Sequence, residues 1–106
     1  MSLFNSSVVE SISRELDACA LRHEAYSANI ANASVPGYER LEVAAALSTT
    51  PEISTPAQLI HTHDAVKLDQ EMAGLSKNAV RYETLLTAYQ QTAGILNLAI
   101  KEGRGA

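Results

Sequence analysis

Residues 29–38 read Asn-Ile-Ala-Asn-Ala-Ser-Val-Pro-Gly-Tyr, and this stretch separates two long helical patterns. A residue that precedes proline is disfavoured in helical geometry, so the helix before Pro36 should end at Ser34 and Val35. Pro36 and Gly37 suit the two central positions of a type II turn, the second of which needs a positive φ. The stretch therefore predicts the end of a helix followed by a tight turn.

Upstream of the turn, residues recur at alternating steps of three and four, the heptad spacing of a helix that packs on another helix. The members of this seam are Val9, Ile12, Leu16, Cys19, His23, Tyr26, Ile30 and Ala33. Ser7 and Glu10 form an S-x-x-E capping box, which is typical of a helix start. We expect a first helix over residues 7–33.

The same spacing continues for longer in the C-terminal part of the chain. This second seam consists of Leu68, Met72, Leu75, Ala79, Tyr82, Leu86, Tyr89, Ala93, Leu96 and Ile100. Asp69 and Glu71 near its start and Lys101 near its end complement the helix dipole. We expect a second helix over residues 68–102, roughly 50 Å long at about 1.5 Å per residue.

A second apolar stripe lies beside the C-terminal seam. It contains Leu85 and Ile95, and Leu98 adds apolar surface further round the helix. One reading is a wide core-facing stripe, as in many amphipathic helices. The other is lateral packing of these three residues against another chain, because a single partner helix does not easily cover two seams.

The connecting segment, residues 34–67, contains Pro51, Pro56 and many Ser and Thr residues, which favour irregular structure. Residues 40–43, Arg-Leu-Glu-Val, alternate polar and apolar as a short strand does. We expect an all-α fold of two long antiparallel helices, with their seams facing each other, joined by this irregular segment. We expect the 106 residues to form a single domain.

Composition excludes several classes of protein. Eight basic and twelve acidic side chains give a formal net charge of −4, which argues against nucleic-acid binding. The single cysteine, Cys19, cannot form an internal disulfide. The first basic residue is Arg14, so we expect no cleavable secretory signal, and no apolar run is long enough to span a bilayer.

Catalytic and metal-binding patterns are weak. His61 and His63 lack the further ligands that a structural zinc site requires, so we interpret them as solvated histidines in a loop. Cys19 and His23 are one helical turn apart, but both lie on the seam, where packing explains them better than nucleophilic catalysis. We expect no enzyme activity, no cofactor and no bound metal.

The 29–38 stretch is the strongest candidate for a functional site. Asn29 and Asn32 project from nearly the same side of the helix, and their amides can both donate and accept hydrogen bonds. Physics alone also allows the plainer reading of a well-capped helix end, since Asn and Pro-Gly are common there. The candidate residues are Asn29, Ile30, Asn32, Pro36, Gly37 and Tyr38.

The stretch Asn29-Ile30-Ala31-Asn32 followed by Pro36-Gly37-Tyr38 resembles the N-terminal signature of the flagellar basal-body rod, hook and hook-associated proteins. Residues 68–73, 77–83 and 99–104 are similar to the C-terminal part of the proximal-rod subunits of that family. The resemblance covers both helices, in the right order and at opposite ends of the chain.

This resemblance implies a tubular assembly in which terminal helices of many subunits pack side by side. It also implies export through the flagellar type III apparatus and a place in the basal body, spanning the periplasm. The implied partners are other rod subunits, the rod–ring adaptor, the membrane ring protein and the export gate, with self-association and without cofactor. The rival interpretations are a cytoplasmic helical-hairpin adaptor or export chaperone and, last, a small metal-dependent enzyme that uses His61 and His63.

Overall fold

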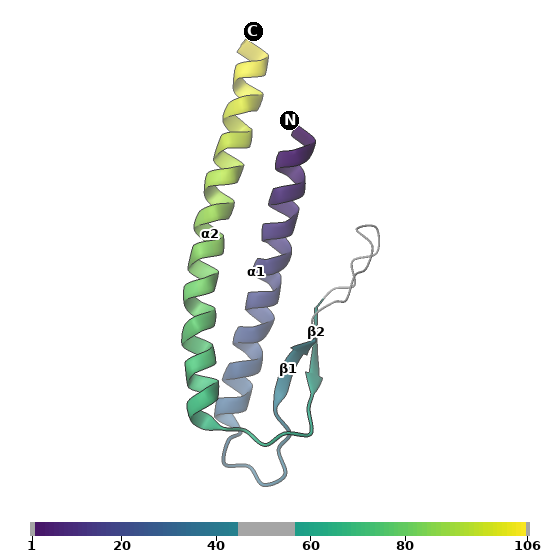
Figure 1. Ribbon diagram of the computed structural model, residues 1–106, viewed down its shortest axis with the longest axis vertical. Coiled ribbons are helices and arrows are strands. Elements are labelled where there is room, and N and C mark those ends of the chain that lie inside the picture. Colours follow the sequence, from purple (N-terminus) through teal and green to yellow (C-terminus); the bar gives the residue numbers. More distant parts are fainter. Residues whose placement is uncertain (1, 45–56, 106) are drawn as a thin grey trace.

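The computed structural model describes residues 2–44 and 57–105. Helix α1 (Ser2–Ala31) and helix α2 (Leu68–Gly105) run antiparallel and form a long hairpin (Figure 1). Strands β1 (Leu41–Ala44) and β2 (Gln58–His61) lie between the helices in sequence and beside α1 in space. The predicted fold, two long antiparallel helices joined by a mainly non-helical segment, is confirmed.

The helix ends differ from the expected ones. Helix α1 begins at Ser2, so the predicted start at Ser7 is wrong. Residues 2–6 contain neither glycine nor proline, and nothing there interrupts a helix. At the other end, α1 stops at Ala31, before the predicted end at residue 33, and α2 continues to Gly105, beyond residue 102.

The turn after α1 has the predicted geometry. The backbone N–H of Tyr38 donates to the carbonyl of Val35 at 3.2 Å, which closes a four-residue turn around Pro36 and Gly37. Gly37 has a φ of 77°, as the second central position of a type II turn requires. The proline and glycine therefore reverse the chain so that β1 can return along α1.

The two strands pair antiparallel, with Leu41 opposite His61 and Ala44 opposite Gln58. Strand β1 confirms the expectation for residues 40–43 to within one residue, whereas β2 was not predicted. The N–H of Thr62 donates to the carbonyl of Arg40 at 2.8 Å, so the pairing continues past the ladder. His61 consequently lies in a strand and not in a loop.

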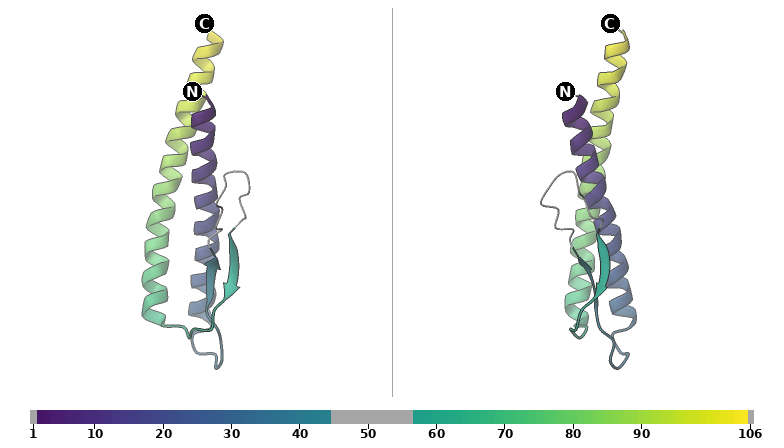
Figure 2. Two further views of the ribbon diagram at one scale, coloured as in Figure 1. Left: turned by 45° about the vertical axis from the view of Figure 1, so that its right-hand side comes forward. Right: turned by 90° about the vertical axis from the view of Figure 1, so that its right-hand side faces the viewer.

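The molecule is thin and elongated (Figure 2). Its extents are 65 × 28 × 13 Å and its radius of gyration is 17.9 Å, against about 13 Å for a compact chain of about 100 residues. Among the described residues, the buried apolar side chains are Ala18, Cys19 and Ala25. Because the apolar core is so small, polar contacts must provide much of the stability of the hairpin. No helix in the described ranges is both long and apolar enough to cross a membrane.

The face of α2 that packs on α1 is rotated from the predicted one. Exposed members of the predicted seam are Leu68, Met72, Ala79, Tyr82 and Ile100. In their place, Glu71 and Asn78 are buried, and Leu85 and Thr92, at the next seven-residue steps, are half-buried. On α1, His23 is also exposed, which contradicts its place in the seam. The reason is that polar groups of α1 and of Arg40, just before β1, form hydrogen bonds with Glu71 and Asn78.

Candidate functional site

Asn29, in the last turn of α1, is completely buried at 0% exposure. Its Nδ2 donates to the carbonyl of Leu41 at 2.9 Å and to Oε2 of Glu71 at 3.0 Å. Its Oδ1 accepts from the N–H of Leu41 at 2.7 Å and from the hydroxyl of Tyr38 at 3.3 Å. An asparagine amide offers two donors and one oxygen that accepts twice, so every capacity of this side chain is used.

The double contact with Leu41 explains the residue type at position 29. The amide bonds both the N–H and the carbonyl of Leu41, as a neighbouring strand would. An aspartate would lack the donors, and an apolar residue would leave both backbone groups without partners in a buried place. Asn29 therefore anchors the start of β1 to the end of α1.

Glu71, in the first turn of α2, is the second centre of this site. Its side chain is 3% exposed, and its Oε1 accepts from Nε of Arg40 at 2.9 Å while Oε2 accepts from Asn29. A buried carboxylate is stable only when it is paired and hydrogen-bonded, and both oxygens of Glu71 meet that condition. We call Asn29, Tyr38, Arg40 and Glu71 the Asn29 cluster.

Arg40 supplies the positive charge of the cluster. Its side chain is partly exposed and also lies 3.6 Å from Glu42. The hydrogen bond to Glu71 raises the pKa of the Arg40 guanidinium above its ordinary value, although burial acts in the opposite direction. Because an arginine keeps its charge at any ordinary pH, Arg40 provides a permanent positive charge beside the buried side chain of Glu71.

A further polar contact lies along the helix interface. Nδ2 of Asn78 donates to the backbone carbonyl of Cys19 at 2.8 Å. Gly74 lies between Glu71 and Asn78 in α2, and the ring of Tyr26 rests against it. A Cβ atom at position 74 would come within 2.5 Å of that ring. Glycine at this position lets the two helices approach closely at the aromatic ring.

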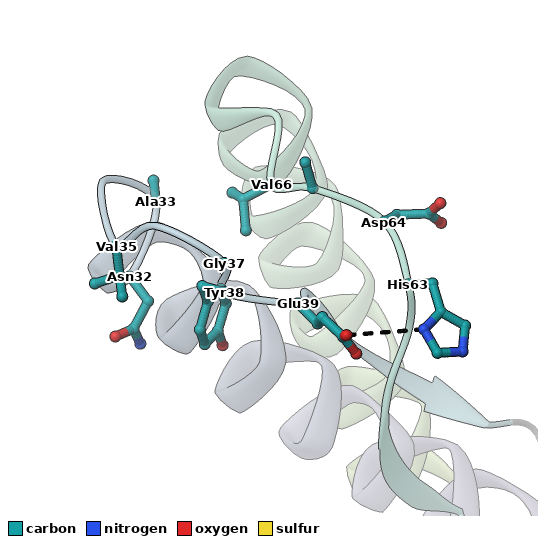
Figure 3. Close-up of a pocket in the computed structure, with 10 residues that line it drawn as sticks. Asn32, Ala33, Val35, Gly37, Tyr38, Glu39, His63, Asp64 and Val66 are labelled. Atoms are coloured by element: carbon teal, nitrogen blue, oxygen red, sulfur yellow. Dashed lines mark ion pairs between the residues drawn. The ribbon is translucent and has the colours of Figure 1, made fainter.

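A groove of about 380 Å³ lies next to the cluster, between the turn after α1 and the segment that leads into α2 (Figure 3). Glu39 and Asp64 border it, and Nδ1 of His63 lies 3.8 Å from the Glu39 carboxylate. Val35, half exposed, forms part of the turn side. The charged part of the groove lining therefore consists of two carboxylates with one histidine beside them.

The predicted site residues have different roles. Asn29 and Tyr38 meet in the cluster, whereas Asn32, the first residue after α1, is half-buried and its amide donates to the carbonyl of Ala28, near the end of α1, at 2.8 Å. Pro36 and Gly37 are exposed in the turn, and Ile30 is half-buried. Of the residues proposed for lateral packing, Ile95 and Leu98 are exposed, but Leu85 is half-buried on the same face as Asn78.

Sequence reasoning missed Arg40, Glu71 and Asn78 as site residues. Acidic residues are common in the first turn of a helix, where they complement the helix dipole. The place of Glu71 in the helix therefore gave no indication that it would also be buried against α1. The only available signal was the seven-residue step from Glu71 to Asn78, which places both on one helix face together with Leu85. Such a polar pair in line with apolar residues is a sign of buried hydrogen bonding.

Among the described residues, the side chains of the histidines and the cysteine make no hydrogen bond to a side chain of the Asn29 cluster. Within the described ranges no group of three or more His, Cys, Asp or Glu could hold a metal ion. His61 Nδ1 lies 3.1 Å from the carbonyl oxygen of Glu39, and its ring meets that of Tyr38 edge-on at 6.3 Å. Cys19 is buried and His23 is exposed, so they do not face one another as a nucleophile and its base would.

Comparisons of this chain with protein-family models, with curated proteins and with solved structures each give no match. The fold and the Asn29 cluster define a helical hairpin braced at one end by a two-stranded sheet. Its function is therefore argued from its own residues.

Proposed function

We propose that this chain is a structural subunit of the bacterial flagellar basal-body rod, of the FlgB proximal-rod type, and not an enzyme. The observation that carries the proposal is the contact between Asn29 and Glu71 at 3.0 Å. Asn29 belongs to the N-terminal stretch that resembles the family, and Glu71 belongs to the C-terminal one. Two sequence signatures that are far apart in the chain therefore have one physical role, which is to close the hairpin.

The outer surface of α2 gives a second argument. Exposed large apolar side chains on this helix include Met72 at 55%, Ile95 at 63% and Leu98 at 57%. A thin hairpin with a small apolar core gains little from such residues in isolation. Lateral packing of helices in a tubular assembly would bury them, and it would explain why the chain is long and narrow.

The proposal includes the partners and the location that the resemblance implies. The neighbours are other rod subunits, including further copies of this chain, the rod–ring adaptor and the membrane ring protein. Delivery is through the flagellar type III export gate, and the final location is the basal body in the periplasm. No cofactor and no nucleic acid take part.

A genetic complementation experiment tests the proposal. Deletion of the gene should abolish external filaments and swimming, and the parent gene should restore both. Ile95→Asp with Leu98→Asp should give a helical, exported subunit that fails to restore them, because an interface would have to desolvate two carboxylates. The matched control is Gln91→Asp with Asn97→Asp, two exposed polar positions on the same part of α2.

Each outcome has a clear meaning. Filaments and swimming restored by the control but not by the Ile95 and Leu98 variant support the rod assignment. Normal swimming in the deletion strain overturns it. A chain that stays in the cytoplasm, bound to a partner helix, favours the adaptor or chaperone instead.

A further inference from the structure

Helix α2 carries two seams that could each pack on α1. Both seams share the positions Leu75, Tyr82, Tyr89 and Leu96. The polar seam completes its heptads with Glu71, Asn78, Leu85 and Thr92, and the apolar seam completes them with Met72, Ala79, Leu86 and Ala93. The two differ by a small rotation of α2 about its own axis.

The hairpin buries the polar seam in the half of α2 near the turn. Glu71 and Asn78 are 3% and 7% exposed, whereas Met72 is 55% exposed and Ala79 is also exposed. Burial of apolar surface alone favours the opposite choice. Specific polar contacts must therefore outweigh it.

Those contacts come from α1 and from Arg40, which directly precedes β1. Glu71 receives hydrogen bonds from Asn29 at 3.0 Å and Arg40 at 2.9 Å, and a rotation that brought Met72 inward would break both. Asn78 donates to the carbonyl of Cys19, but its Oδ1 has no partner among the described residues. An amide left half-satisfied in a buried place is a cost. The burial of Asn78 is therefore unfavourable by itself, and another contact must hold α2 in the observed rotation.

We propose that the contacts of Glu71 set the rotation of α2, bring Asn78 inward with it, and hold the apolar stripe of Leu68, Met72 and Ala79 on the outside of the hairpin. A single polar residue in a helix interface is known to select one register at a cost in stability. In this hairpin, the buried polar residue determines which face of α2 remains available to solvent and partners. The inference concerns the isolated hairpin and does not depend on the rod assignment.

Cys19 allows a direct test, because it is the only cysteine in the chain. Asn78→Cys places a thiol at the position that now reaches the Cys19 backbone, and Ala79→Cys places one at the next, exposed position. Under mild oxidation of dilute protein, we expect the 19–78 disulfide to form at least about ten times more than the 19–79 disulfide. That ratio corresponds to a preference of about 1.4 kcal/mol. Equal yields at the two positions would overturn the inference.

A second experiment tests whether the polar contacts set the rotation. In the Ala79→Cys background, Arg40→Leu removes one partner of Glu71, and Arg40→Leu with Asn29→Leu removes both. We expect the yield of the 19–79 disulfide to rise in that order, as Glu71 turns toward water and Ala79 turns toward α1. Asn32→Leu is the matched control, since within the described ranges the side chain of Asn32 hydrogen-bonds to Ala28 and not to Glu71, and it should leave the yield unchanged.

Circular dichroism on each variant checks that the helices are intact. An unchanged 19–79 yield in the helical Arg40→Leu protein overturns the proposal, even if the double variant does not fold. An equal rise with Asn32→Leu also overturns it, because the effect would then be general loosening of the hairpin. A graded rise that spares the control supports it.

Discussion

The Nδ2 atom of Asn29 lies 3.0 Å from Oε2 of Glu71, and this hydrogen bond joins residues 42 positions apart in the sequence. Both side chains are buried, at the end of the hairpin where α1 stops and α2 starts (Figure 1). The apolar core there is small, so hydrogen bonds and one ion pair close the hairpin. This arrangement makes the fold sensitive to changes of a single polar atom.

Replacement of Asn29 should be the most damaging change to a polar residue of the turn region. Asn29→Ala leaves the N–H and carbonyl of Leu41 and one oxygen of Glu71 without their partners, at a cost of about 3 kcal/mol in the free energy of unfolding. Asn29→Asp keeps the shape but loses both donors and faces Glu71 with a like charge, so we expect a similar loss at neutral pH. Urea unfolding followed by circular dichroism measures both.

Asn32→Ala is the control for this prediction. Its amide contacts only the Ala28 carbonyl, so the cost in the monomer should stay below about 1 kcal/mol. Equal losses at positions 29 and 32 would show that the turn, and not the Asn29 cluster, determines stability.

Arg40→Lys should make the hairpin more sensitive to alkaline pH. The pKa of Arg40 is raised in the folded state by Glu71, so the pair stabilises the fold at every pH below the ordinary value of arginine and is lost only above it. For lysine the same loss begins near its ordinary pKa of about 10.4. The melting temperature of the variant should therefore fall relative to the parent as the pH rises above about 10.4. A constant difference across the pH range would mean that the shape of Arg40, and not its charge, is what counts.

Gly74→Ala and Gly94→Ala should have opposite effects although both glycines are in α2. Alanine is favoured over glycine in a helix by about 1 kcal/mol, and nothing lies within 4 Å of a Cβ at position 94, so that variant should gain stability. At position 74 the Cβ would lie 2.5 Å from the Tyr26 ring, which would have to move. We expect a net loss of about 1–3 kcal/mol there. Thermal melts of the two proteins decide it, and a gain at both positions would mean that the ring moves aside freely.

The sequence predicts the fold well and the site only in part. Heptad spacing, Pro36 and Gly37 predict both helices and the turn, because these signals act locally. The same spacing predicts the wrong face of α2, since counting apolar residues favours Met72 and Ala79 over Glu71 and Asn78. The correct face depends on Asn29, Arg40 and the Cys19 carbonyl, which come from distant parts of the chain.

Strand β2 escaped prediction for a related reason. Its four residues carry no alternating pattern strong enough to identify a strand without its partner. The pairing is set by β1, which is in turn anchored to Asn29 by both backbone groups of Leu41. Asn29 itself was identified from the sequence, but its partner Glu71, and Arg40, which pairs with Glu71, were not.

His61→Ala with His63→Ala should change neither metal content nor assembly. His63 is 98% exposed, and the ring of His61 makes only an edge contact with Tyr38 and a hydrogen bond at the surface. We expect a loss below about 1 kcal/mol, mostly from the Tyr38 contact. Metal analysis after dialysis is the measurement. Stoichiometric zinc in the parent that disappears in the double variant would contradict the prediction.

The C-terminal end of α2 should exchange its amide hydrogens quickly in the monomer. Glu15 lies opposite Arg81 and Cys19 opposite Asn78, so α1 begins opposite about residue 94, and the last turns of α2 extend past it (Figure 1). A helical segment as short as residues 97–105 is marginal in water when no other helix packs on it. We expect strong protection over residues 71–92 and weak protection over 97–105 in dilute protein, measured by hydrogen exchange with mass spectrometry. Protection at the C-terminal end should increase with protein concentration if Ile95 and Leu98 pack against further copies. Uniform protection of α2 at the lowest concentration would show that the end is stable by itself, and would remove one argument for a lateral partner.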